Sequence, residues 1–220
     1  MPDAHKYSPT GGTMSFNSRR IALNCIAALS ILGCGSAEIT GTEQERPFNG
    51  LKLLTVSADA PPLATTVTSF YAVRGKNAGV DIWYRAKAGT KDSTKFLEFR
   101  LEDTSLDRRP DGTAFANGDS VRITLTVTDA THLIVDFQPS GLRFSAKNPA
   151  RLKIFFGQCG EDLDRNGKVD GEDDAIQQQL SIWRQETVTA PWYKVSSALV
   201  KSNKEIDADL GGFTGYAAAY

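Results

Sequence analysis

A mainly β protein, built as an antiparallel β-sandwich, is the fold that this sequence predicts. Residues 121–127 (VRITLTV) alternate apolar and polar side chains without a break, as expected for a strand with one face in a core and the other in solvent. Turn-forming groups recur between short runs of branched and aromatic residues, for example at residues 61–62 (PP), 110–112 (PDG) and 117–119 (NGD). Short strands separated by turns at this spacing are typical of sandwiches.

Residues 1–34 predict a lipoprotein signal peptide rather than folded structure. The arginine pair at residues 19–20 precedes a mostly apolar run, residues 21–33. That run is too short to span a bilayer and suits the apolar core of a signal peptide. It leads into I-L-G-C, which resembles a bacterial lipobox and predicts lipid on Cys34 as the first residue of the mature chain. Met14 is an alternative start of translation. An ordinary secretory leader and a short buried helix are the alternative interpretations.

The charge and the cysteine content of the mature chain argue against a nucleic-acid partner and against an internal disulfide. Loss of the leader lowers the basic count from 25 to 22 and the acidic count from 26 to 25, which leaves a net charge near −3. This mild acidic balance offers no basic patch, so no nucleic acid is expected as a partner. Cys25 leaves with the leader and Cys34 carries lipid, so Cys159 has no cysteine to pair with. We expect it to pack as a small apolar residue.

Residues 35–48 are polar and predict a flexible tether, and residues 49–220 then form one sandwich domain with residues 160–184 inserted into it. The strands expected before the insertion are residues 70–73, 80–84, 96–101, 121–127, 133–137 and 151–156. Those expected after it are residues 192–195, 205–210 and 216–220. Neither flank has enough apolar residues for a core of its own, so we expect the two flanks to share one. The residues expected to be buried together are Leu152, Ile154, Phe156, Val195, Ile206 and Tyr216.

One short helix interrupts the β pattern, at residues 172–180. Its acidic first turn suits the positive end of a helix dipole. Ile176, Leu180 and Trp183 recur at helical spacing, so we expect all three to face the sandwich.

Residues 162–173 (DLDRNGKVDGED) follow the spacing of an EF-hand calcium loop. Oxygen-bearing side chains stand at loop positions 1, 3, 5, 9 and 12, glycine stands at position 6, where the backbone turns sharply, and position 7 can offer its carbonyl. Ca²⁺ takes six to eight such hard oxygens. The predicted calcium ligands are Asp162, Asp164, Asn166, Lys168 (through its carbonyl), Asp170 and Asp173. Val169 at position 8 is expected to point inward. The alternative is an Asp- and Gly-rich surface turn.

Two family resemblances rest on these segments. Residues 137–144 (FQPSGLRF), followed by Pro149 and Leu152, resemble a turn and strand of ZU5-like domains. Residues 213–217 (FTGYA) resemble the ending of bacterial lipoproteins that carry such domains. The resemblance implies an Ig/ZU5-like sandwich that serves as a structural or interaction module and not as an enzyme.

The second resemblance concerns residues 160–173 and the helix after them, which are similar to one dockerin repeat. Dockerins attach secreted proteins to cohesins and normally carry two such repeats, whereas this chain has one. The resemblance implies a protein partner of the cohesin type.

The prediction for function is a lipid-anchored, extracytoplasmic calcium-binding module of the bacterial cell envelope, facing the periplasm or the exterior, without catalysis. Its expected partner is the membrane, through the lipid on Cys34. Dockerin-like attachment is the first alternative, and a hydrolase of envelope polysaccharide, or its accessory domain, is the second. For a hydrolase, Glu98 and Glu205 offer carboxylates on predicted strands and His132 stands in a predicted turn, but neither G-x-S-x-G nor H-E-x-x-H occurs.

Overall fold

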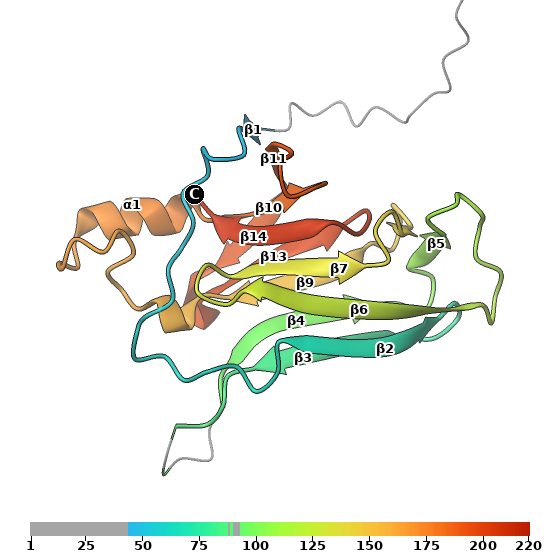
Figure 1. Ribbon diagram of the computed structural model, residues 1–220, viewed down its shortest axis with the longest axis horizontal. Helices are drawn as coiled ribbons and strands as arrows, with labels where there is room; N and C mark the ends of the chain where they lie inside the picture. The colour runs from blue at the N-terminus through green and yellow to red at the C-terminus, as the bar shows by residue number, and fades with distance from the viewer. Residues whose placement is uncertain (1–43, 88, 90–92) are drawn as a thin grey trace, which may run out of the picture. The chain divides into compact units, whose positions relative to one another are not determined.

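Two large antiparallel sheets make up most of the computed structural model, which describes residues 44–87, 89 and 93–220 (Figure 1). The signal peptide, Cys34 and residues 35–43 of the predicted tether lie outside the described residues. Within the described residues, the strand content, the antiparallel pairing and the presence of one α-helix confirm the prediction of a mainly β protein and are consistent with a β-sandwich.

The first sheet has seven strands and the second has five, and a separate two-stranded pair lies at one end. In order across the first sheet, the strands are β1 (Glu45–Arg46), β11 (Trp192–Lys194), β10 (Ser181–Gln185), β14 (Gly215–Ala219), β7 (Ile134–Gln138), β6 (Ser120–Asp129) and β2 (Val67–Val73). The second sheet runs β12 (Ser197–Val200), β13 (Glu205–Leu210), β9 (Ala150–Phe155), β4 (Lys95–Leu101) and β3 (Ala78–Trp83). The pair is β5 (Leu106–Arg108) with β8 (Arg143–Phe144), the helix is α1 (Gly171–Gln179), and short 3-10 turns span Gly157–Cys159 and Lys201–Asn203.

The two sheets share one core whose centre is a group of aromatic rings. Phe213, in the loop before β14, lies 4.9 Å from Phe137 of β7 and 4.9 Å from Phe144 of β8 between ring centroids. Phe99 of β4 reaches Phe137 at 5.1 Å from the opposite sheet. The segments that carried the ZU5-like resemblance therefore supply core side chains, while the family itself stays a prediction.

The two flanks of the predicted insertion share this core, as expected. β13 pairs with β9 in a register that places Ile206 opposite Ile154. Leu152, Ile154, Phe156, Ile206 and Tyr216 are all buried in the same cluster, and Val195 is partly buried against it. Burial here supports the prediction that strands on both sides of the calcium-loop segment belong to one fold.

The helix prediction is right in place but wrong in one residue. α1 begins at Gly171 and ends at Gln179, and Leu180 has an extended backbone (φ −55°, ψ 133°). Trp183, which the helical spacing places on the same stripe, lies instead in β10, where it is 1% exposed. The spacing extends to Trp183 because β10 is buried on both faces: Ile176 and Leu180 belong to the main core, whereas Trp183 packs with Trp192 in a second cluster. Strand β10 thus occupies residues 181–185, so the predicted insertion of residues 160–184 ends too late in the chain.

Other short elements did not stand out in the sequence. β1 lies within residues 35–48, where a tether was expected, and it pairs with β11. β5, β8 and β12 also escaped prediction because strands of two to four residues show too little alternation to recognise.

Candidate metal centre

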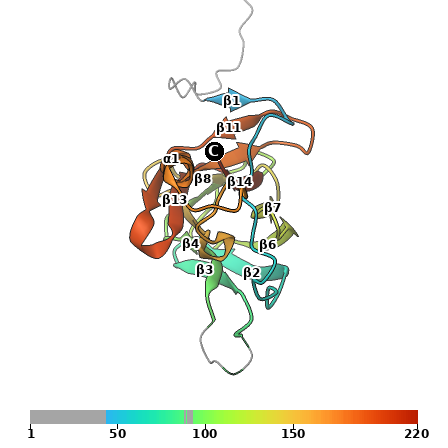
Figure 2. The same cartoon turned by 90° about the vertical axis from the view of Figure 1, so that its left-hand side faces the viewer.

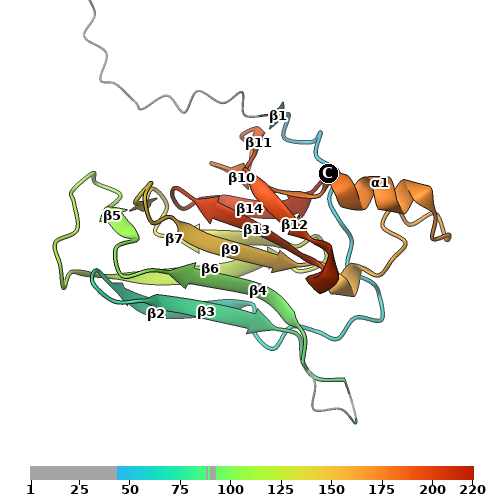
Figure 3. The ribbon, with the colours of Figure 1, turned by 180° about the vertical axis from the view of Figure 1, so that it is seen from behind.

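The predicted calcium loop joins the two sheets at one end of the sandwich. β9 of the five-stranded sheet leads through a 3-10 turn into residues 162–173, and α1 then leads into β10 of the seven-stranded sheet. Figure 1 shows α1 and this loop projecting at the left-hand end, and Figure 3 shows the same arrangement from behind. The loop is therefore attached to the core at both of its ends, as a strand-loop-helix unit.

Carboxylates at the start of the loop fold its backbone by accepting local hydrogen bonds. Asp162 accepts from the N–H groups of Asn166 at 3.1 Å and Gly167 at 3.0 Å. Asp164 accepts from the same Asn166 N–H at 3.0 Å and from its side-chain amide at 2.8 Å. Gly167 has φ +84°, a left-handed conformation that a residue with a side chain adopts only with strain. The sharp turn predicted at loop position 6 is therefore present.

Asp173, the last predicted ligand, closes the loop against its beginning. Its Oδ1 accepts from the Leu163 N–H at 2.6 Å, and its Oδ2 accepts from the Asp170 N–H at 2.9 Å. The second bond is half of a capping box at the start of α1. The Asp170 N–H, followed by those of Leu163 and Asp164, holds the pKa of the Asp173 carboxyl below its ordinary value, although burial acts in the opposite direction. The carboxyl thus keeps its negative charge at neutral pH.

Three of the predicted ligands converge. One carboxylate oxygen from each of Asp162, Asp164 and Asp173 lies within 4.8 Å of the other two. Asp170 is outside this group, because it is the N-cap of α1 and its carboxylate accepts from the Glu172 N–H at 2.9 Å. Asn166 lies beside the group through its bond to Asp164, and its Oδ1 accepts from the Lys168 N–H at 2.8 Å.

Val169 does not point inward as expected. Its side chain is 68% exposed. In the described part of the chain no second loop of this kind lies opposite it, so nothing buries the side chain at loop position 8.

The donor set suits a hard cation. Three carboxylates within a few ångströms concentrate negative charge, and every side-chain donor is oxygen, as Ca²⁺ prefers. Asn166 and the Lys168 carbonyl are further oxygens on the same turn. The pKa of the Tyr220 phenol is raised, mainly by burial and also by the negative charges of Asp164 and Asp173.

The carboxylates considered for a hydrolase lie elsewhere, on the outer face of the five-stranded sheet. Glu98 makes an ion pair with Lys95, and Glu205, which is 4% exposed, accepts from Lys153 Nζ at 3.1 Å. His132 Nδ1 lies 2.7 Å from the carboxylate of Asp129 in the turn after β6. Each of these groups therefore has a neighbouring side chain as its ion-pair or hydrogen-bond partner.

A row of charged residues on this face was not anticipated from the sequence. Asp81, Glu98, Lys153 and Asp207 stand opposite one another on four neighbouring strands. Lys153 Nζ lies 3.3 Å from Asp207, whose pKa is raised by burial, against the effect of this lysine. The alternation of polar residues on these strands indicated an exposed face, but only strand pairing set them in register.

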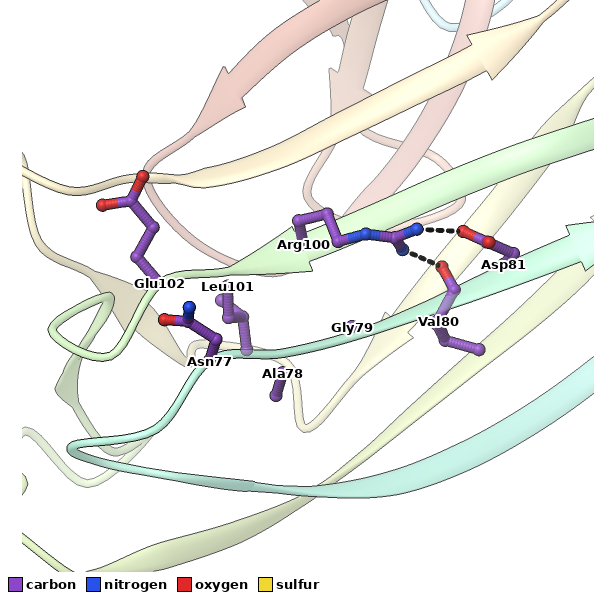
Figure 4. Close-up of a pocket in the computed structure, with 8 residues that line it drawn as sticks. All are labelled: Asn77, Ala78, Gly79, Val80, Asp81, Arg100, Leu101 and Glu102. Carbon is purple, nitrogen blue, oxygen red and sulfur yellow. Dashed lines mark hydrogen bonds and ion pairs between the residues drawn. The ribbon is translucent and has the colours of Figure 1, made fainter.

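Beside this row, the side chain of Arg100 extends from β4 and its guanidinium reaches the edge strand β3, as Figure 4 shows. It pairs with Asp81 at 2.7 Å and donates to the Val80 carbonyl at 3.1 Å. A hollow of about 560 Å³ next to it is also lined by Asn77 and Glu102.

Comparisons with known proteins found no family model, no curated protein and no solved structure that matches this chain. Among the residues that the structure describes, none of the helices has both the length and the apolar character needed to cross a membrane.

Proposed function

We propose that this protein is a lipid-anchored, extracytoplasmic β-sandwich module of the bacterial cell envelope that binds one Ca²⁺ and has a structural or interaction role without catalysis. The observation that carries the calcium part is the convergence of Asp162, Asp164 and Asp173 at EF-hand spacing. The lipid anchor rests on the sequence around Cys34 alone.

Asp162, Asp164 and Asp173 would hold the ion by their carboxylates, and Asn166 and the Lys168 carbonyl would supply further oxygens from the same loop. Bound Ca²⁺ supplies positive charge that offsets the repulsion among the carboxylates. We expect the weak affinity of extracellular modules, on the order of 10⁻⁴ to 10⁻³ M, because the loop has no paired partner and carries Asp at position 12. Calcium at about 1 mM would still occupy such a site to about half or more.

Thermal melting with Ca²⁺ and with chelator tests this proposal. At a Ca²⁺ concentration of about a hundred times the dissociation constant, binding to the native state alone adds roughly 2.7 kcal/mol. For a domain of this size that raises the midpoint by about 5 to 10 °C. Asp162→Ala should lose most of this gain and stay folded, whereas Asp103→Ala, a change of an exposed carboxylate after β4, should keep it.

The result that contradicts the calcium proposal is a wild-type midpoint that chelator leaves unchanged, together with no binding heat at millimolar Ca²⁺. The anchor is tested by mass spectrometry of the membrane fraction, which should find a mature chain that begins at a lipidated Cys34. An unmodified chain in the soluble fraction would contradict the anchor.

Dockerin-like attachment is the second candidate, favoured by the exposure of Val169 beside a hollow of about 340 Å³ between the loop and α1. Leu163, Asp174 and Gln177 also line this hollow. Calorimetric titration with a cohesin domain in calcium separates the candidates, because only attachment predicts binding that Val169→Asp abolishes.

A further inference from the structure

The N-terminal part of the described chain forms a strap across the end of the sandwich, defined here as residues 50–57. In Figure 1 this blue segment descends from β1 past the end of the chain marked C, and Figure 2 shows it from the side. It runs between β14 and the loop of residues 162–173. A change in the conformation of that loop can therefore affect how the strap is held.

Backbone hydrogen bonds fix the strap at several points. The Tyr220 N–H donates to the Lys52 carbonyl at 3.0 Å, and Leu53 forms a β-bridge with Ala219. Further on, the N–H of Val56 donates to Thr131 at 2.8 Å and that of Ser57 donates to Gln158 at 2.8 Å. These amide groups are protected from solvent exchange only while the strap stays in place.

The strap covers a small apolar cluster on the outer face of the seven-stranded sheet. Leu51 and Leu53 pack on Trp183 and Trp192, which are 1% and 6% exposed. Release of the strap would uncover both tryptophans, so its attachment decides whether this apolar surface is available.

One side chain of the loop holds the strap directly. The guanidinium of Arg165 donates to the carbonyl of Thr55. Arg165 has φ +63° and follows Asp164, so it is the cation nearest in sequence to the converging carboxylates. It makes no ion pair with them in the described part of the chain, because it is turned toward the strap.

We propose that Ca²⁺ in the loop of residues 162–173 locks the strap onto the sandwich through the Arg165–Thr55 hydrogen bond. This inference rests on the proposed calcium site. Without the ion, the carboxylates of Asp162 and Asp164 attract the guanidinium and compete with the Thr55 carbonyl for it. With the ion, their charge is offset and the loop backbone is fixed, so Arg165 stays on the strap.

Hydrogen exchange of the full chain, with Ca²⁺ and with chelator, tests the coupling. Ca²⁺ at about a hundred times the dissociation constant should slow exchange of the Val56 and Ser57 amides by roughly tenfold, below the hundredfold ceiling that complete coupling would give. Arg165→Gln should still bind Ca²⁺ by calorimetry, with an affinity changed by no more than about the tenfold coupling factor, but lose this slowing. Arg122→Gln, a change of an exposed arginine on β6, should behave as wild type.

Each result decides between the two levels of the proposal. Calcium binding without slower exchange at Val56 and Ser57 would overturn the coupling and leave the calcium site standing. Full slowing in Arg165→Gln would show that this arginine is not the link. Absence of calcium binding by calorimetry would overturn both the site and the coupling.

Discussion

Gly79 in the edge strand β3 is a position where one methyl group should disturb the fold in a predictable way. A Cβ at Gly79 would lie 2.5 Å from the Phe99 carbonyl oxygen and 2.8 Å from Cδ of Arg100. The first atom is backbone of the neighbouring strand and cannot move alone, so β3 must shift away from β4. The second belongs to the side chain whose guanidinium bonds Val80 and Asp81 of β3 in Figure 4.

The expected cost of Gly79→Ala combines opposing contributions. Steric overlap of this kind in a packed structure costs about 1 to 3 kcal/mol. Displacement of Arg100 weakens its bonds to Val80 and Phe99, but its side chain is 41% exposed, so this adds little. The smaller entropy of the unfolded alanine chain returns about 0.4 to 1 kcal/mol. We expect a net loss of about 1 to 2 kcal/mol in the free energy of unfolding, or about 2 to 8 °C in the midpoint.

Gly211→Ala is the matched control, because a Cβ there meets nothing within 4 Å and the backbone is not left-handed. Its midpoint should equal or slightly exceed that of the wild type. Thermal melting of the two variants beside the wild type is the assay. The steric reasoning is refuted if Gly79→Ala melts at or above the wild-type temperature, or if both variants lose the same amount.

The remaining predictions concern the core. Phe213→Ala removes a ring that is 1% exposed and should lower the free energy of unfolding, measured in urea, by about 3 to 5 kcal/mol. Phe48→Ala, at a residue that is 55% exposed, should change it by no more than about 0.5 kcal/mol. Equal losses in the two variants would contradict the assigned core. Cys159 is buried, which raises the pKa of its thiol from 9.0 to about 12. A thiol reagent at pH 8 should therefore react with Cys159 only after denaturation, and rapid labelling of the native protein would show that the thiol is accessible. The contribution of the neutral thiol to the free energy of unfolding should be lost as pH rises from 9 toward about 12.

Strands were predictable wherever alternation extended over five or more residues. Residues 121–127 predicted β6 and residues 205–210 predicted β13, because each strand has one buried face and one face nearer to solvent. β10 was missed because most of its residues are buried on both faces, which erases the alternation. The same burial placed Trp183 on a helical stripe that it does not belong to.

The sequence by itself determined the β class, the position of the helix and a loop with EF-hand spacing, because these depend on neighbours within a few residues. The tertiary structure decided which carboxylates meet: Asp162, Asp164 and Asp173 converge, while Asp170 caps α1. It also decided that Arg165 reaches Thr55, far away in the chain. Such contacts depend on how the strands pair and on which segments pack across the end of the sandwich. A local pattern of residues does not determine either of these.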